Sequence, residues 1–296
     1  MTAEKITLIA LQVATFASIM AVGFKASAME PFFLFRRPSL LIRTFVAMYV
    51  VVPVVTGVVF ALVPLPIGVK VGLTLLAISS ALTTSPHQML SLGADRSYVF
   101  SLLISVSLLA AITVPLSLAI LTALPLAADG SAPPLQVARL IATTFLLPLI
   151  VGAFVSRFAP RFAERISDPM TAWSGRVLMA TLVSLLILNF GGVKEVGVLS
   201  FVVTAGLTVT ALAAGHLLGG PDFGDRAALA IAASSRHTSM AALLAGINFP
   251  DKRGAIVVIV VYKIATTLAT IPYTKWCKQQ LAARSAGASV VEPKFA

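Results

Sequence analysis

The sequence predicts an all-α polytopic membrane protein, and three observations support this class. Hydrophobic residues make up 58% of the 296 residues and charged residues only 11%, whereas a typical soluble domain has about 25% charged residues. Apolar runs of spanning length, roughly 17–25 residues, recur along the chain with short polar stretches between them. The runs are continuous rather than alternating, which favours helices over the strands of a membrane barrel. We expect one transmembrane domain, residues 1–296, in a lipid bilayer.

Nine apolar runs define the expected helices. They cover 6–27, 41–63, 66–93, 97–125, 136–156, 173–190, 196–218, 226–248 and 253–274. The first run, with Lys5 before it and Ala26-Ser-Ala28 after it, has some features of a secretory signal peptide. It is longer than the apolar part of such a peptide, and Lys25 interrupts the approach to the cleavage-like site. We therefore expect residues 6–27 to remain as the first membrane helix.

Basic residues predict the orientation, because cytoplasmic loops are rich in Lys and Arg. Alternate connections and the C-terminal segment hold Arg36, Arg37, Arg43, Arg96, Arg157, Arg161, Arg165, Arg226, Lys275, Lys278 and Arg284. The intervening loops are poorer in basic residues. The N-terminus is thus expected outside and the C-terminus in the cytoplasm, in the inner (plasma) membrane of the cell. The same loops account for the net charge of +11 without a nucleic-acid partner.

Two of the nine runs contain polar residues that a lipid-facing helix would exclude. The third run holds "TSPHQM" (Thr84–Met89), and the eighth holds "SSRHTSM" (Ser234–Met240). Pro86 lacks a backbone N–H and breaks the helix, which frees backbone groups that hydrocarbon cannot satisfy. Such a break is tolerated where it lines a cavity or contacts other protein. Paired breaks in the two halves of a chain are typical of secondary transporters.

The order of the runs predicts an inverted repeat. Runs one to four correspond to runs six to nine, which leaves the fifth run unpaired. An offset of five crossings is odd, so the second copy is inverted relative to the first. We expect an inverted-repeat transporter fold in which two broken helices cross near the bilayer midplane and bind substrate where the breaks meet.

Arg236 is the first candidate for binding substrate. A guanidinium at the bilayer centre costs about 2.5–3.5 kcal/mol on insertion scales, so it should face a partner or a substrate. It can bind a carboxylate through two hydrogen bonds. His87 and His237 can hydrogen-bond a substrate or carry protons. The expected site also includes hydroxyl and amide neighbours and one further cation, namely Thr83, Thr84, Ser85, Gln88, Ser234, Ser235, Thr238 and Lys263.

Other polar residues have plainer explanations, and enzyme chemistry is disfavoured. We expect His216 to hydrogen-bond between helices, and Lys25 either to extend from a helix end towards water or to have a functional role. The chain has 11 acidic residues, mostly in loops, and one cysteine, Cys277, so no acid pair, disulfide or metal site is expected. The Ser–His pairs at 85/87 and 235/237 are two residues apart and point to different helix faces, which argues against a local hydrolase site.

Taken segment by segment, the chain resembles the bile acid:sodium symporters and their bacterial relatives. The segments that carry the resemblance are, in order, "IMAVGFKASAMEPFFLFRRPS", "VGLTLLAISSALTTSPHQMLSLGADRS", "LLPLIVGAFVSRFAP" and "RAALAIAASSRHTSMAALLAGINFP". Glu30 stands where the family has an acidic residue. The resemblance implies a core domain, whose two broken helices cross, and a panel domain. Nine-helix members of the family lack the first helix of the ten-helix pattern.

The residues that bind sodium in the family are not retained. In the sodium-coupled members, the second crossing helix has a glutamate and, four residues on, a glutamine followed by asparagine. Here those positions are Ala232, Arg236 and His237, and the serine–asparagine of the first crossing helix is Ser85-Pro86. A sodium site needs several oxygen ligands and usually a carboxylate. We therefore expect that the two sodium sites are not used, that Arg236 takes the place of a cation, and that the histidines couple transport to protons.

The expected function is secondary active transport of a small organic anion by alternating access, with no cofactor. Two related alternatives are a sodium-coupled organic anion symporter with altered sites and an auxin-efflux-type exporter. A channel is disfavoured because only the third and eighth runs carry polar clusters. An intramembrane enzyme is the most distant alternative. The sequence leaves open the substrate, the direction of transport, the coupling ion and the oligomeric state.

Overall fold

The computed structural model describes residues 3–25, 33–79, 86–123, 139 and 142–290, and every regular element in these residues is a helix. Six helical segments are long and apolar enough to cross a membrane by length and composition. They are Ala3–Phe24, Pro38–Leu62, Arg96–Val114, Pro160–Leu188, Phe190–Leu218 and Arg253–Arg284. The predicted all-α polytopic membrane class is therefore confirmed. The number of crossings and the inverted repeat stay predictions.

The helices of the first half correspond to the first four apolar runs. They are α1 (Ala3–Phe24), α2 (Pro38–Phe45), the π-helix η2 (Val46–Val51), α3 (Val52–Leu62), α4 (Ile67–Ile78), α5 (Pro86–Leu90) and α6 (Arg96–Ala123). The second run is thus one rod, α2–η2–α3. The third run is divided into α4 and α5, as expected for a run that contains Pro86.

The helices of the second half correspond to the remaining five runs. They are the π-helix η3 (Ala142–Leu146), α8 (Leu147–Phe158), α9 (Pro160–Leu188), the 3-10 helix η4 (Phe190–Gly192), α10 (Val193–Leu218), α11 (Phe223–Ser234), α12 (Thr238–Asn248) and α13 (Arg253–Val290). The eighth run is divided at residues 235–237, between α11 and α12. The interruption predicted from "SSRHTSM" is therefore present.

Two helices are longer than the sequence predicts. α9 begins at Pro160 rather than at residue 173, and α13 continues to Val290 rather than ending at residue 274. Hydropathy detects only the apolar part of each helix, whereas the first turns of α9 carry the exposed Arg161 and Arg165. Proline in the first turn favours a helix start, because the N–H that proline lacks would have no helical partner there in any other residue.

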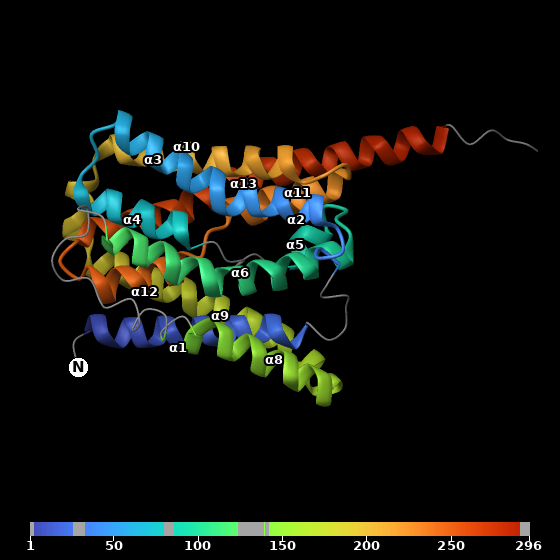
Figure 1. Cartoon of the computed structure of the whole chain (residues 1–296), viewed down its shortest axis with the longest axis horizontal. Coiled ribbons are helices and arrows are strands. Elements are labelled where there is room, and N and C mark those ends of the chain that lie inside the picture. The colour runs from blue at the N-terminus through green and yellow to red at the C-terminus, as the bar shows by residue number, and fades with distance from the viewer. Residues whose placement is uncertain (1–2, 26–32, 80–85, 124–138, 140–141, 291–296) are drawn as a thin grey trace, which may run out of the picture.

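α1, α8 and α9 pack together along one side of the molecule (Figure 1). α1 and α8 approach closely because glycines meet: a Cβ on Gly152 would lie 2.4 Å from the carbonyl oxygen of Met20 and 2.9 Å from the Cα of Gly23. The Ser156 hydroxyl donates to the Phe24 carbonyl at 2.6 Å. Lys25 forms an ion pair with Asp168 of α9 at 2.6 Å, which gives this lysine a structural partner.

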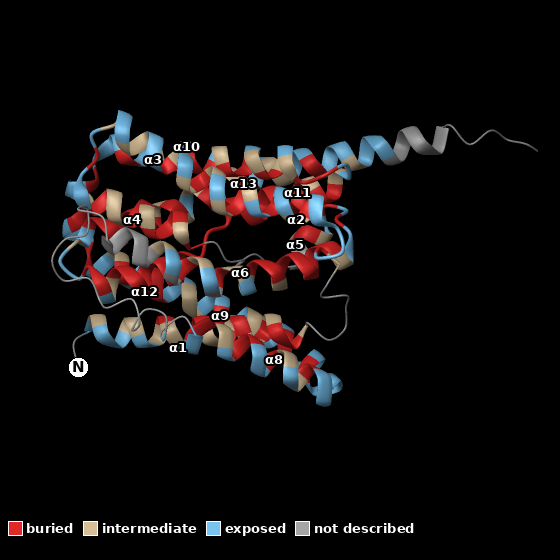
Figure 2. Ribbon diagram, in the orientation of Figure 1, coloured by how far each residue is buried: buried red, intermediate tan, exposed pale blue. Residues whose placement is uncertain are grey.

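The remaining helices surround α11 and α12, whose residues are almost all buried (Figure 2). Small residues again allow close crossings. A Cβ on Gly72 of α4 would meet Ala255 of α13 at 2.6 Å, and one on Gly215 of α10 would meet Leu229 of α11 at 2.5 Å. These contacts fix α4, α10 and α13 around the interrupted eighth run.

Gly152→Ala should destabilise the protein by about 1–3 kcal/mol, since the added methyl group overpacks the α1–α8 crossing. The matched control is Gly206→Ala in α10, where an added Cβ meets nothing within 4 Å and the substitution favours the helix. The measurement is the unfolding midpoint of both variants in detergent. Equal midpoints for the two variants would contradict the close glycine crossing.

Candidate functional site

The break between α11 and α12 is capped by its own residues. Ser235 and His237 have non-helical backbone angles, with ψ of 77° at both. Nδ1 of His237 accepts the backbone N–H of Met240 at 3.2 Å and lies 2.9 Å from the Ser239 hydroxyl. His237 is thus the N-cap of α12, where a side-chain acceptor satisfies one of the free N–H groups of a helix start. This geometry places the proton of the neutral ring on Nε2.

The same break contacts the C-terminus of α4, so the two interrupted runs meet. The backbone N–H of His237 donates to the Ser79 carbonyl at 3.0 Å. One guanidinium nitrogen of Arg236 donates to the Ala77 carbonyl at 3.3 Å. The last carbonyls of a helix lack helical partners and carry partial negative charge, so donors and a cation are favourable there.

Arg236 is buried, with 1% of its surface exposed. The nitrogen that reaches Ala77 also donates to the Met48 carbonyl in η2 at 2.7 Å. In a π-helix this carbonyl would accept from the residue five positions on, which is Pro53 and has no N–H. Arg236 therefore joins η2 to the end of α4. Its predicted role as the substrate anchor stays a prediction.

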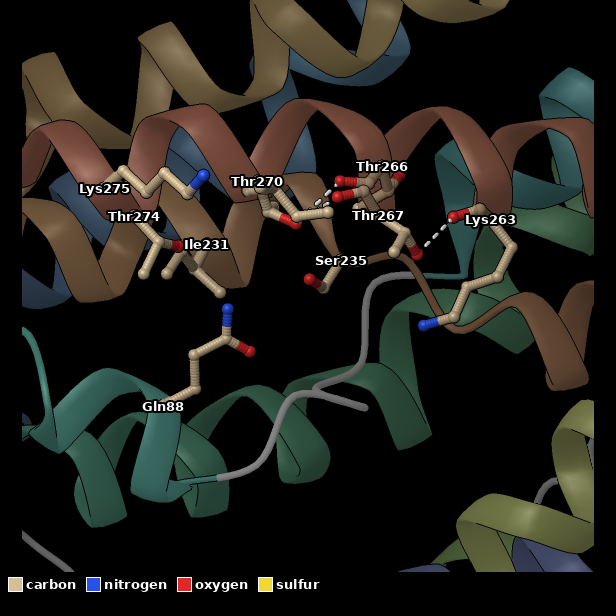
Figure 3. Close-up of a pocket in the computed structure, with 10 residues that line it drawn as sticks. Gln88, Ile231, Ser235, Lys263, Thr266, Thr267, Thr270, Thr274 and Lys275 are labelled. Atoms are coloured by element: carbon tan, nitrogen blue, oxygen red, sulfur yellow. Dashed lines mark hydrogen bonds between the residues drawn. The ribbon is translucent and has the colours of Figure 1, made fainter.

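A cavity of about 450 Å³ lies between α13, α5 and the break (Figure 3). Most of its lining residues come from α13 and are polar. The described residues that line it are Gln88, Ile231, Ser235, Lys263, Thr266, Thr267, Thr270, Ile271, Thr274 and Lys275. Binding cavities for small molecules typically have volumes of about 300–1,000 Å³. The size and position of this cavity suit a small ligand that binds beside the crossing.

The polar face of α13 follows the helical repeat. Lys263, Thr267, Thr270 and Thr274 are three or four residues apart, so they lie along one face of the helix. A polar face on an apolar helix of spanning length is tolerated where it lines water or protein. The Tyr262 hydroxyl, on a neighbouring face, donates to the Ser234 carbonyl at 2.9 Å and holds α13 against the end of α11.

The cavity carries positive charge without a compensating carboxylate. In the described part of the chain, the single ion pair is that of Lys25 with Asp168, so neither Lys263 nor Lys275 is paired with an acid there. The sequence has no Asp or Glu in 226–248 or in 253–274. An ammonium group in such a place attracts anions and can donate up to three hydrogen bonds. The arrangement can therefore bind an organic anion.

The structure brings only some of the predicted site residues to the cavity. Gln88, Ser235 and Lys263 line it, whereas Ser234, Arg236, His237 and Thr238 are buried in and around the break. Pro86 begins α5, and for His87 the structure describes the helical backbone alone. Thr83, Thr84 and Ser85 lie outside the described residues.

The sequence interpretation missed Lys275 and the four threonines of α13. The polar residues of the ninth run are spaced three or four apart, and this spacing indicates one polar helix face. The interpretation of His216 is confirmed: its Nδ1 lies 2.7 Å from the Tyr273 hydroxyl, which links α10 to α13.

A second polar cluster lies outside the expected membrane runs, where Asp225 at the start of α11 approaches the loop before α6. A cavity of about 390 Å³ there is lined by Phe33, Arg37, Gly93, Asp95, Asp222 and Asp225. Asp225 is buried, and its carboxylate accepts the Asp95 N–H at 3.1 Å. Burial raises the pKa of Asp225 from 3.8 to about 6, although the Asp95 N–H and Arg37 act in the opposite direction.

The comparison with known families agrees with the resemblance seen in the sequence. The profile of the Sodium Bile acid symporter family matches residues 9–196, which is more than half of the chain. A search of curated proteins finds no match. The matched region includes Gln88 and ends in α10, so the α13 face of the cavity lies beyond it.

Asp225→Asn should remove a pH dependence of stability. Because the pKa is raised in the folded protein, the stabilising effect of the protonated carboxyl is complete below its ordinary pKa and is lost as pH rises through about 6. The melting temperature of the unmodified protein should therefore fall relative to Asp225→Asn between about pH 4 and pH 6 and run parallel to it above that range. The exposed Glu164→Gln on α9 is the control and should keep the original slope. Identical slopes for all three proteins would contradict the assignment.

Proposed function

The chain belongs to the sodium bile acid symporter family, and on that premise we propose that it is a secondary active transporter of a small organic anion. The observation that carries the proposal is the cationic cavity beside the break of the eighth run, with Lys263 in its wall. A lysine within a membrane-spanning helix is costly unless it reaches water or a partner, and such residues mark substrate pathways. We propose no enzymatic activity.

Lys263 is the proposed anchor of the substrate's anionic group. It stands at one end of the row of threonines and points its ammonium group into the cavity (Figure 3). Ser235 and Gln88, from the two interrupted runs, offer hydrogen bonds to the rest of the ligand. Arg236 is next to Ser235 in the chain and adds a fixed positive charge beside the cavity. His87 and Thr238 are proposed to contact the substrate as well.

Alternating access is proposed to move the α1–α8–α9 group relative to the rest of the molecule. η3, which leads directly into α8, contacts the break of the eighth run. The ring of its Phe145 lies edge-on to the ring of His237, with 4.8 Å between the ring centroids. Cyclic exposure of a site at crossing breaks is the mechanism of inverted-repeat transporters. The proposed orientation, with the N-terminus outside and the C-terminus in the cytoplasm, is supported by the basic loops.

The proposed coupling uses protons rather than sodium. The guanidinium of Arg236 donates to the carbonyls of Met48 and Ala77. It is a cation held by the chain, and we propose that it takes the place of a sodium ion. His237 is the proposed proton site, and its Nδ1 accepts the Met240 N–H only while it is unprotonated. A proton on Nδ1 would remove the cap of α12 and change the break that borders the cavity. Proton binding would thereby alter the geometry of the substrate site.

Lys263→Gln should lower the uptake of the transported anion into proteoliposomes by about tenfold or more, because a charge-assisted hydrogen bond is lost. The substrate is found first by a thermal-shift screen of organic acids on the purified protein. Arg236→Ala is measured in the same screen. A ligand that stabilises Arg236→Ala as much as the unmodified protein contradicts Arg236 as an anchor, and one that stabilises Lys263→Gln equally contradicts Lys263.

Replacing sodium by choline should leave uptake unchanged, whereas an inward proton gradient should increase it. The physical reason is that a fixed guanidinium adds positive charge and supplies no oxygen ligand for sodium. Uptake is measured in proteoliposomes with matched ionic strength on both sides. A large loss of uptake without sodium would contradict the proposed coupling and support a sodium symporter with altered sites.

A further inference from the structure

The cavity has a cation at each end. Lys263 and Lys275 are both on α13 and are separated by twelve residues, which is about 18 Å along a helix axis. Figure 3 shows them at opposite ends of the row of threonines, with Gln88 facing the row from α5. Their side chains are too far apart along the helix to converge on one small carboxylate. Each ammonium group is available to a separate anionic group.

The wall between the two lysines presents mainly hydrogen-bond acceptors. The hydroxyl of Thr267 donates to the Lys263 carbonyl at 2.9 Å, and that of Thr270 donates to the Thr266 carbonyl at 2.8 Å. A threonine whose proton is used in this way still has lone pairs on its oxygen. Those oxygens suit hydroxyl groups on a ligand, which can donate to them.

Thr274 adds a further polar group to this wall. Its hydroxyl oxygen is buried and has no hydrogen-bond partner among the described residues. A buried polar atom without a partner costs about 1–3 kcal/mol, so a ligand or water in the cavity would improve its environment. The unsatisfied hydroxyl points to an occupant with polar groups along its length.

The described lining combines apolar and polar surface. Ile231 and Ile271 supply hydrocarbon side chains, and the threonine methyl groups and lysine methylenes lie beside hydroxyl, amide and ammonium groups. A bulky apolar ligand would displace water from the hydroxyl, amide and ammonium groups without replacing their hydrogen bonds, which is unfavourable. The lining therefore favours a ligand that carries polar groups along its length.

We propose that the cavity binds an elongated organic dianion, a dicarboxylate whose two ends contact Lys263 and Lys275 and whose hydroxyl groups contact the threonine oxygens. This inference rests on the proposed transport of an organic anion and names the substrate class. A single carboxylate satisfies one ammonium group and leaves the other to water. A dicarboxylate satisfies both, and its middle part follows the polar face of α13.

The test is calorimetric titration of the purified full-length protein in detergent. The probes are succinate, adipate and tartrate, with butyrate and hexanoate as the monocarboxylates of matching chain length. The best dicarboxylate should bind about tenfold more tightly than its matched monocarboxylate, because it makes a second charge-assisted contact. One dicarboxylate should bind per protein.

Variants of the two lysines separate the contacts. Lys275→Gln should lower dicarboxylate affinity to the monocarboxylate level and leave monocarboxylate affinity unchanged, whereas Lys263→Gln should weaken both. Lys275→Arg keeps the charge and should keep the preference for dicarboxylates. Lys278→Gln, on the exposed surface of the same helix, is the control and should bind like the unmodified protein. The melting temperature of each variant verifies folding.

Equal affinities for dicarboxylates and monocarboxylates would overturn the dianion proposal, as would an unchanged preference in Lys275→Gln or the binding of two monocarboxylates per protein. Each of these results would leave anion transport by Lys263 intact. If no organic acid binds and none is taken up into proteoliposomes, the proposed function fails together with the dianion. The two failures are therefore distinguishable.

Discussion

The centre of this structure depends on how main-chain carbonyls without helical partners are satisfied away from water. α4 ends inside the protein, so Ala77 and Ser79 present such carbonyls, and the Met48 carbonyl of η2 accepts from the same break. The break of the eighth run supplies the donors, through the N–H of His237 and the guanidinium of Arg236. Since hydrocarbon offers no substitute, each interrupted helix requires the other, and the cavity lies beside the break of the eighth run.

The positive charges near the break of the eighth run have two kinds of surroundings. A guanidinium has several donors in a fixed plane, which suits the joining of carbonyls from two separate helices. A lysine carries a compact charge on a flexible stem, which suits a ligand that must be bound and released. In the described arrangement Arg236 contacts Met48 and Ala77, while Lys263 and Lys275 line the cavity. The guanidinium therefore joins two helices, whereas the two lysines lie in the wall of the cavity.

The sequence predicts those features that depend on composition and on local breaks. Hydropathy alone gives the helical membrane class, and Pro86 together with "SSRHTSM" locates the two interruptions. The direction of Arg236 could not be predicted, because it depends on the Met48 carbonyl, which is 188 residues away in the chain. The lengths of α9 and α13 were underestimated because their ends are polar. The spacing of the threonines in the sequence indicates that they share one face of α13. The sequence near them does not show which face of that helix lies beside the break.

The face of α13 that lines the cavity is set by contacts elsewhere on the helix. Its first turns, Ala255–Val260, are buried, and the Gly72 crossing brings Ala255 and the backbone of α4 together. Further along α13, the hydroxyl of Tyr262 donates to the carbonyl of Ser234, the last residue of α11. Two contacts at different heights fix both the rotation and the position of a helix. With that rotation fixed, the following turns direct Lys263, Thr267, Thr270 and Thr274 towards the cavity, so close packing at one end of α13 determines the chemistry of the cavity at the other.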